Sequence, residues 1–461
     1  MSVSRRIQSK INALLPHASF ARNVGTLAGG TSLAQAFSVL ALPVITRLYT
    51  PEDFSVLAVY AALLSMTGVV ACLRFEIAIP IPADGFEAAN LAALALLFTT
   101  LSTLMIGLVV LVFSQEIAAG LGQPALQSYL WLLVPGVWLT GSFACVQYLA
   151  TRSRKFREIS RTRLTQAVGS AVVQIAMGWL TKSGPLGLLL GQVTASGTGF
   201  ISLAKETWVE SAAFARQTTR HTLSSTFRKY SRFPKFSTFE SLANNANIEL
   251  PILIIAAYAS GPQAGFALVA MKAVAIPLTL IGSSISQVYL SHAPERLREG
   301  KLPTFTQKII ASLFGAGVGP LIGIGILAPA AIPLVFGPQW ERAGILVAWM
   351  TPWFALQILS SPISMALHVT GNQRLAMVNQ VWGLILRVGM TLYAAIYIDK
   401  YIVEAYCLSG AIFYLGYLMI LVKVSGINTA TLLRDMCRRL PVVGAFIMIA
   451  YVIQVAIQLS T

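Results

Sequence analysis

The chain has 461 residues, of which 56% are hydrophobic and 11% charged, and its mean hydropathy is +0.71. Ordinary soluble domains carry about 25% charged residues, so this composition excludes a soluble globular protein. The net charge of +16 would point to nucleic acid in a soluble protein. Here no nucleic-acid partner is expected, because the basic residues gather in alternate loops and report membrane topology.

Apolar runs of about 20 residues recur along the chain, and each can cross a hydrocarbon core of about 30 Å. They predict an all-α polytopic membrane protein. The predicted spans are residues 24–46, 54–79, 88–113, 127–150, 164–181, 185–203, 237–258, 264–291, 308–328, 343–368, 375–398, 402–424 and 441–459. The ninth span is rich in Gly and Pro, which predicts a kink.

The distribution of Lys and Arg predicts the orientation. With the amino terminus inside, 27 of the 33 basic residues fall in inside loops. Because basic loops stay in the cytoplasm, we expect a multi-pass protein with a cytoplasmic amino terminus.

The longest hydrophilic stretch divides the chain into two halves. We expect a six-helix bundle at residues 1–203, a basic cytoplasmic linker at 204–235, a second six-helix bundle at 236–424, and a basic loop with an additional transmembrane helix at 425–461. Six-span units begin and end on the same side of a membrane, so the bundles are expected to be parallel repeats around a central cavity. A Leu-Pro step followed by a turn occurs in both halves, about 208 residues apart.

Polar residues gather in the two spans that open the second half. Glu240, Asn244 and Asn247 are spaced by four and three residues, which places them on one helical face. The next span carries Lys272 and Gln287. Such side chains are costly at membrane depth unless they face a polar interior, so they predict a transport cavity between the halves.

Five segments, spread over both halves, occur in the order and separation of a known transporter family. They are NVGTLAGGTSLAQAFSVLALPVITRLYTPEDF, LRFEIAIPIP, TRSRKFREISRTR, residues 232–289 and PLVFGPQWERAG. In these segments the chain resembles the bacterial polysaccharide-unit flippases, the O-antigen and exopolysaccharide translocases of the multidrug/oligosaccharidyl-lipid/polysaccharide exporter superfamily. That family is described with twelve or fourteen spans, so a thirteenth is a departure.

The resemblance implies a function. Such flippases move an undecaprenyl-pyrophosphate-linked oligosaccharide from the cytoplasmic to the periplasmic leaflet of the bacterial inner membrane by alternating access, for surface polysaccharide or lipopolysaccharide biosynthesis. Membrane lipids are partners, and a polysaccharide polymerase and a chain-length regulator are further partners to be considered. A pyrophosphate head would need fixed positive charge in the cavity, which Arg and Lys supply.

Two basic residues within spans are the leading candidates for that charge. Arg387 lies near the middle of its span, where snorkelling to the surface explains it least, and Lys272 ranks beside it. Arg47 lies either at the outer cavity mouth or at the lipid head groups. Arg74 and Glu76 follow the second span, either as an inner gate or as an anchoring ion pair.

The carboxylates and amides leave alternatives open. Glu240 and Glu249 are candidates for coupling transport to protons, or they pair with Lys272 or Arg387. Asn244, Asn247 and Gln287 suit sugar hydroxyls, but amides also join membrane helices. The same holds for Gln35, Gln166, Gln174 and Gln380, while Trp131, Trp138, Trp340, Trp349 and Trp353 are expected to be interfacial anchors.

Rival functions are a cation-coupled drug or small-molecule antiporter of the same superfamily, and a membrane polysaccharide polymerase. A cation exporter would want acidic residues in its cavity, whereas Lys272 and Arg387 favour an anionic substrate. The sequence contains no recognisable nucleophile–base pair, metal-ligand spacing or phosphate-binding glycine loop. We therefore expect no enzyme activity, no catalytic residue, no metal and no cofactor.

Overall fold

The computed structural model describes residues 16–181, 184–215 and 218–460, and within them it contains helices and no strands. The first bundle contains six long helices. They are α2 (Pro16–Leu48), α3 (Pro51–Ala71), α5 (Gly85–Gly120), α6 (Leu133–Arg152), α7 (Phe156–Thr181) and α8 (Leu186–Ala215). The short helix α4 (Phe75–Ala78) and the 3-10 helix η1 (Pro124–Leu132) lie in its connections.

The second bundle follows the short helix α9 (Arg220–Lys229). Its long helices are α10 (Thr238–Tyr258), α11 (Gln263–Arg298), α12 (Leu302–Leu313) with α13 (Gly319–Phe336), α14 (Glu341–Ser360), α16 (Gln373–Tyr397) and α17 (Ile402–Val424). The predicted kink is a π-helical turn, Phe314–Val318, between α12 and α13. The additional C-terminal helix is α19 (Leu440–Ser460), which follows α18 (Thr429–Cys437) and packs against α13.

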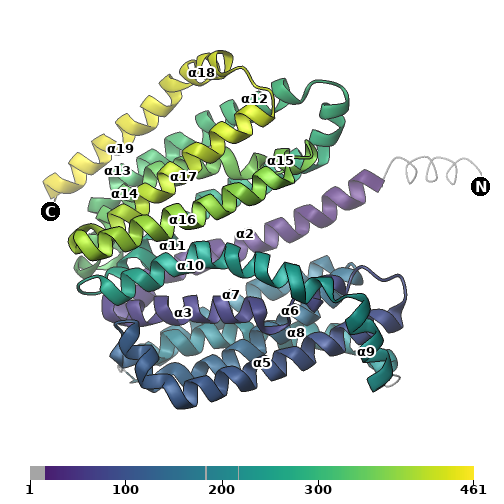
Figure 1. The fold of residues 1–461 in the computed structure, drawn as a ribbon. Coiled ribbons are helices and arrows are strands. Elements are labelled where there is room, and N and C mark those ends of the chain that lie inside the picture. Colours follow the sequence, from purple (N-terminus) through teal and green to yellow (C-terminus); the bar gives the residue numbers. More distant parts are fainter. Residues whose placement is uncertain (1–15, 182–183, 216–217, 461) are drawn as a thin grey trace, which may run out of the picture.

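Ten helices of the described part are long and apolar enough to cross a membrane. The helices α7, α10 and α11 are not among these ten, and the first two carry the polar faces described below. The two bundles lie side by side, with α2 between them (Figure 1). The predicted all-α polytopic fold is confirmed.

The long helices of both bundles run between two ends of the molecule (Figure 1). We call the end that holds the α6–α7, α8–α9 and α11–α12 connections the basic end. The opposite, far end holds the α2–α3, α10–α11 and α13–α14 connections. The predicted linker at 204–235 contains the last turns of α8 and all of α9, whose Lys229 pairs with Glu87 of α5.

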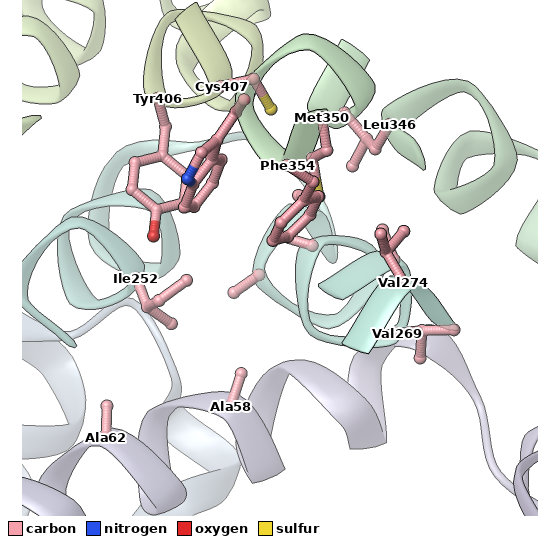
Figure 2. Close-up of a cluster of buried hydrophobic side chains, with 14 of the residues drawn as sticks. Ala58, Ala62, Ile252, Val269, Val274, Leu346, Met350, Phe354, Tyr406 and Cys407 are labelled. Atoms are coloured by element: carbon pink, nitrogen blue, oxygen red, sulfur yellow. The ribbon is translucent and has the colours of Figure 1, made fainter. Parts of the chain in front are cut away.

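The bundles meet where α3 packs along α10 and α11. Figure 2 shows Ala58 and Ala62 of α3 facing larger buried side chains of the second bundle, among them Ile252 of α10 and Tyr406 of α17. Small residues let helices approach closely in a membrane protein. The contact between bundles is therefore tight along one side of the molecule.

Candidate substrate cavity and far-end closure

A cavity of about 490 Å³ lies among helices of the first bundle and reaches α11 of the second. Its lining includes polar side chains from four helices. They are Thr31, Gln35 and Ser38 of α2, Arg163, Gln166, Ser170 and Gln174 of α7, Gln192 and Ser196 of α8, and Lys272 of α11. No Asp or Glu belongs to the lining that the structure describes.

The polar face of α7 has helical periodicity. Gln166, Ser170 and Gln174 are four residues apart, so they project on one side of the helix, toward α2 and α8. Two of these glutamines were ambiguous from sequence, because an amide can equally join helices. The structure brings Gln166 and Gln174 together with Gln35 at one cavity.

Two glycines of α8 make room for these glutamines. A Cβ atom at Gly191 would lie 2.4 Å from Cγ of Gln174, and one at Gly199 would lie 2.3 Å from Nε2 of Gln166. Since α7 and α8 run antiparallel, the pairs 166–199 and 174–191 are in register along the two helices. The cavity wall thus depends on the absence of two side chains.

Two cations lie at the cavity, and the sequence predicted one of them. Lys272 lines the cavity as expected for a span residue. Arg163 lines it as well, although its position in a basic loop had assigned it to topology. Its Nη2 donates to Oε1 of Gln147 at 3.1 Å, and its guanidinium lies 5.8 Å from the ring centre of Phe143. The sequence did hold a signal for placing Arg163 at the cavity. Arg163 and Gln166 are three residues apart, and residues at that spacing lie on the same face of a helix.

Arg387 lies elsewhere, in the interior of the second bundle. Its side chain is 4% exposed, its Nη2 donates to the Tyr406 hydroxyl at 3.0 Å, and its guanidinium lies 4.4 Å from the Trp353 ring and 5.0 Å from the Tyr406 ring. Its Nε has no hydrogen-bond partner among the described atoms. Lys272 and Arg387 therefore do not share one pocket, because Arg387 is not part of the cavity lining.

The residues predicted on one face of α10 divide into two environments. Glu240 and Asn244 are exposed, whereas Asn247 is buried, and its Oδ1 lacks a partner in the described structure. The neighbouring Asn245 exchanges hydrogen bonds with Ser65 of α3, at 3.1 and 3.2 Å.

Two further predictions on α10 and α11 have different outcomes. Glu249 is half-buried on α10, the helix that packs against α3 of the first bundle. Among the described residues it forms no ion pair with Lys272 or Arg387 in this conformation. The side chain of Gln287 lies outside the part of the chain that the structure describes.

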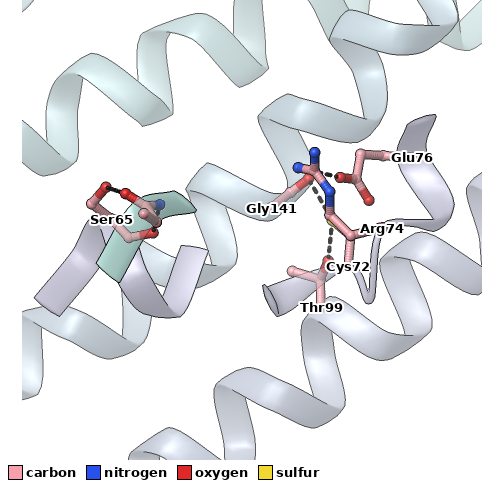
Figure 3. A network of polar contacts seen from close by, with 7 residues as sticks. Ser65, Cys72, Arg74, Glu76, Thr99 and Gly141 are labelled. Carbon is pink, nitrogen blue, oxygen red and sulfur yellow. Dashed lines mark hydrogen bonds and ion pairs between the residues drawn. The ribbon is translucent and has the colours of Figure 1, made fainter. Parts of the chain in front are cut away.

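Arg74 and Glu76 form an ion pair at the basic end, with 3.4 Å between Nη1 and Oε1 (Figure 3). Arg74 adopts a left-handed backbone conformation with φ of 62°, and Cys72 next to it bonds to Thr99 and to the Gly141 carbonyl. Glu76 lies between the spans α3 and α5, and burial raises the pKa of its carboxyl, with Arg74 opposing the shift. The two residues are thus paired, and their role as an inner gate or as an anchor stays a prediction.

At the far end, the helix ends of the two bundles cap each other. The indole Nε1 of Trp340 donates to the Thr46 carbonyl at 3.0 Å, and Gln339 Nε2 donates to the same oxygen at 3.2 Å. In return, Arg47 Nη2 donates to the Leu334 carbonyl at 3.4 Å. The last carbonyls of a helix lack partners within it, so each bundle satisfies a helix end of the other.

Both carbonyls are available for a local reason. The Thr50 N–H, which would otherwise bond to Thr46, donates to the Asp53 carboxylate at 3.0 Å. The residue four positions after Leu334 is Pro338, which has no N–H. We call the contacts of Trp340, Gln339 and Arg47 with these carbonyls the far-end clasp.

Aromatic packing and a close helix approach reinforce the clasp. Trp340 is fully buried, with its ring centre 4.9 Å from Phe54 of α3 and 5.9 Å from Phe266 of α11. The expectation that Trp340 is an interfacial anchor was wrong, and so was that for Trp353, which is 5% exposed beside Arg387. The Gly265 N–H donates to Ser55 Oγ at 2.9 Å, and a Cβ at Gly265 would lie 2.2 Å from the Pro51 carbonyl.

Two helical bundles, an internal polar cavity and a closed far end define a polytopic helical membrane protein. The structure is similar to that of the lipid II flippase MurJ in an inward closed conformation, with a TM-score of 0.70, 13% identity, and coverage of 94% of this chain and 97% of that one. It is also similar to an inward-facing multidrug resistance MATE family transporter of the MOP superfamily, with a TM-score of 0.55, 13% identity, and coverage of 87% and 94%.

The family is shown by sequence. The model of the polysaccharide biosynthesis protein family matches residues 44–344, which is more than half of the chain, and the chain belongs to this family. No curated protein is matched by the sequence.

Proposed function

We propose that this protein is a flippase for lipid-linked oligosaccharides. It moves undecaprenyl-pyrophosphate-linked repeat units from the cytoplasmic to the periplasmic leaflet of a bacterial inner membrane, for O-antigen, exopolysaccharide or other surface polysaccharide. Its action is transport by alternating access and not catalysis. The basic end faces the cytoplasm, as the distribution of Lys and Arg favours.

The observation that carries this proposal is the composition of the cavity. Lys272 and Arg163 supply positive charge, four glutamines supply amide donors and acceptors, and the described lining has no carboxylate. Cations and amides suit an anionic head joined to sugar hydroxyls. Membership in a polysaccharide biosynthesis family agrees with such a cargo.

The rival function is that of a cation-coupled antiporter, and the similarity of the fold to a MATE family transporter is compatible with it. A cavity for organic cations needs carboxylates or aromatic faces against the positive charge. Phe54 and Phe143 do line the cavity, but the Arg163 guanidinium lies 5.8 Å from the Phe143 ring centre, and Lys272 and Arg163 would repel a cation. The cavity therefore favours the flippase.

We propose that the carboxyl that couples transport to protons lies on α10. Glu249 is the stronger candidate for a coupling carboxyl, because it is half-buried on the helix that meets α3 at the bundle contact, whereas Glu240 is exposed. Asn244 and Asn247 remain candidate cargo contacts on the same helix, and Arg47 acts in the far-end clasp. Membrane lipids surround the bundles, and a polymerase and a chain-length regulator are proposed as pathway partners.

The test uses inverted membrane vesicles loaded with an undecaprenyl-pyrophosphate-linked oligosaccharide. Appearance of the saccharide on the opposite leaflet is followed for the wild type, Lys272→Gln and the exposed-site control Arg374→Gln. Translocation by the wild type and the control, with loss in Lys272→Gln at equal protein levels, supports the flippase. Export of an organic cation in place of the lipid-linked saccharide would establish the antiporter.

A further inference from the structure

The cavity lies mostly within one bundle, and its volume limits what it can hold. At about 490 Å³ it falls within the range of about 300–1,000 Å³ that is typical of small-molecule sites. A whole oligosaccharide on a polyprenyl diphosphate does not fit into such a space. The cavity can therefore take only one part of the proposed cargo.

The amides of the wall are free to bind that part. Among the described residues, the side chains of Gln35, Gln166 and Gln192 form no hydrogen bond with other protein groups, and Gln174 reaches Ser170 and the Leu188 carbonyl only at 3.4 and 3.5 Å. A primary amide offers two donors and one acceptor oxygen. Hydroxyl groups both donate and accept, so a ring bearing several hydroxyls matches a wall of amides.

The position of these amides is set by packing. Gly191 and Gly199 receive the side chains of Gln174 and Gln166 at distances that no Cβ would allow. Side chains held between two helices lose little further rotamer freedom when a ligand binds. The wall is thus a preorganised surface, which is what recognition of a polar ligand requires.

A cation stands at the same cavity and comes from the other bundle. Lys272 of α11 lines the cavity and forms no ion pair among the described residues. Arg163 already donates to Gln147 and lies near Phe143, so Lys272 is the less engaged of the two cavity cations. An anion bound there would contact both bundles at once.

We infer that this cavity binds a single sugar ring that carries an anionic group, with the amides of α2, α7 and α8 on the ring hydroxyls and Lys272 on the anion. The inference rests on the proposed function and names the part of the cargo that the cavity selects. Two sources share this chemistry. They are the first sugar of the cargo, which bears the diphosphate, and an acidic sugar within the repeat unit.

The test measures binding to the purified full-length protein in nanodiscs of phosphatidylcholine by isothermal titration calorimetry. The probes are glucose 1-phosphate, glucuronate, glucose and inorganic phosphate. Glucose 1-phosphate is expected to bind more tightly than glucose or phosphate. If glucuronate binds as tightly, the source is any acidic ring, and if it binds no better than glucose, the source is the phosphorylated first sugar.

Variants test the cation and the amide wall of the site separately. Lys272→Gln should lower the affinity for glucose 1-phosphate about ten-fold or more and leave glucose unchanged, since a charge-assisted bond is lost. The double variant Gln166→Leu/Gln174→Leu should weaken every sugar and leave phosphate unchanged. Gly191→Ala displaces Gln174 without removing a polar group. It should also weaken the binding of every sugar, but by less than the double variant does. Arg374→Gln is the control, and melting temperatures show that each variant is folded.

Several results would overturn the inference. They are equal binding of glucose 1-phosphate by the wild type and Lys272→Gln, unchanged sugar binding by the glutamine double variant, and no binding of any sugar up to its solubility. The vesicle assay distinguishes this failure from that of the proposed function. Translocation with normal binding by all variants refutes the site alone, whereas the expected binding pattern without translocation of any lipid-linked saccharide refutes the flippase alone.

Discussion

Trp340 should control the opening of the far end. Two substitutions separate the contribution of its hydrogen bond from that of its aromatic packing. Trp340→Phe keeps an aromatic ring against Phe54 but removes the indole N–H that donates to Thr46 at 3.0 Å. Trp340→Leu removes both the hydrogen bond and the aromatic pair. If the bundles separate at this end during transport, both changes favour the open state.

The magnitude follows from the contacts that are broken on opening. A net hydrogen bond contributes about 1 kcal/mol, so Trp340→Phe should raise the open fraction about five-fold. The pair with Phe54, which belongs to the other bundle, adds about 1 kcal/mol. The contact with Phe266 survives, because α11 and Trp340 belong to the same bundle. Trp340→Leu should therefore raise the open fraction about thirty-fold.

Thiol labelling measures this fraction. Ala264 lies at the far end and is 1% exposed, so a cysteine there reacts only when this end opens. Cys437, the one exposed cysteine of the described chain, is first changed to Ser. In the Ala264→Cys protein the labelling rate then reports the open population.

The control is Trp349→Leu, which alters a tryptophan that is 50% exposed outside the clasp. Its labelling rate should equal that of the parent. Parent-like rates for both Trp340 variants, in folded protein, would refute the clasp as the closure of this end. A similar rise for Trp349→Leu would show that the effect is general loss of stability.

Three further outcomes are expected. Gly265→Ala should open the far end in the same labelling assay, because its Cβ would lie 2.2 Å from the Pro51 carbonyl; an unchanged rate would contradict this. Arg387→Gln should abolish translocation at equal protein levels. Arg387→Lys should not restore it, because an ammonium cannot reproduce the stacked guanidinium between Trp353 and Tyr406. Normal surface polysaccharide with either variant would count against a transport role. Burial raises the pKa of the Glu76 carboxyl, and Arg74 offsets this only in part, so ionising Glu76 costs stability and the melting temperature should fall as pH rises through that pKa. Glu76→Gln should remove this fall, and a pH profile parallel to that of the wild type would contradict the reasoning.

The architecture was readable from the sequence because the bilayer constrains each span separately. A backbone that crosses hydrocarbon must satisfy its own hydrogen bonds, so every long apolar run becomes a helix whatever its neighbours are. The all-helical architecture, the long apolar helices and the kink before Gly319 needed no tertiary information. The membership of Lys272 in a polar cavity was also predictable, since an isolated charge within a span requires a polar surrounding.

The grouping of side chains from different helices depended on tertiary packing. Arg163 and Lys272 are 109 positions apart in sequence and meet at one cavity only because α7 and α11 flank it. Trp340 and Thr46 are likewise joined only when two helix ends meet. Periodicity gives the face of a helix on which a residue lies, but the partner of that face depends on how the helices pack. For that reason Lys272 and Arg387, which are both charged span residues of the second bundle, have different surroundings. Lys272 lines the cavity, whereas Arg387 lies between the rings of Trp353 and Tyr406.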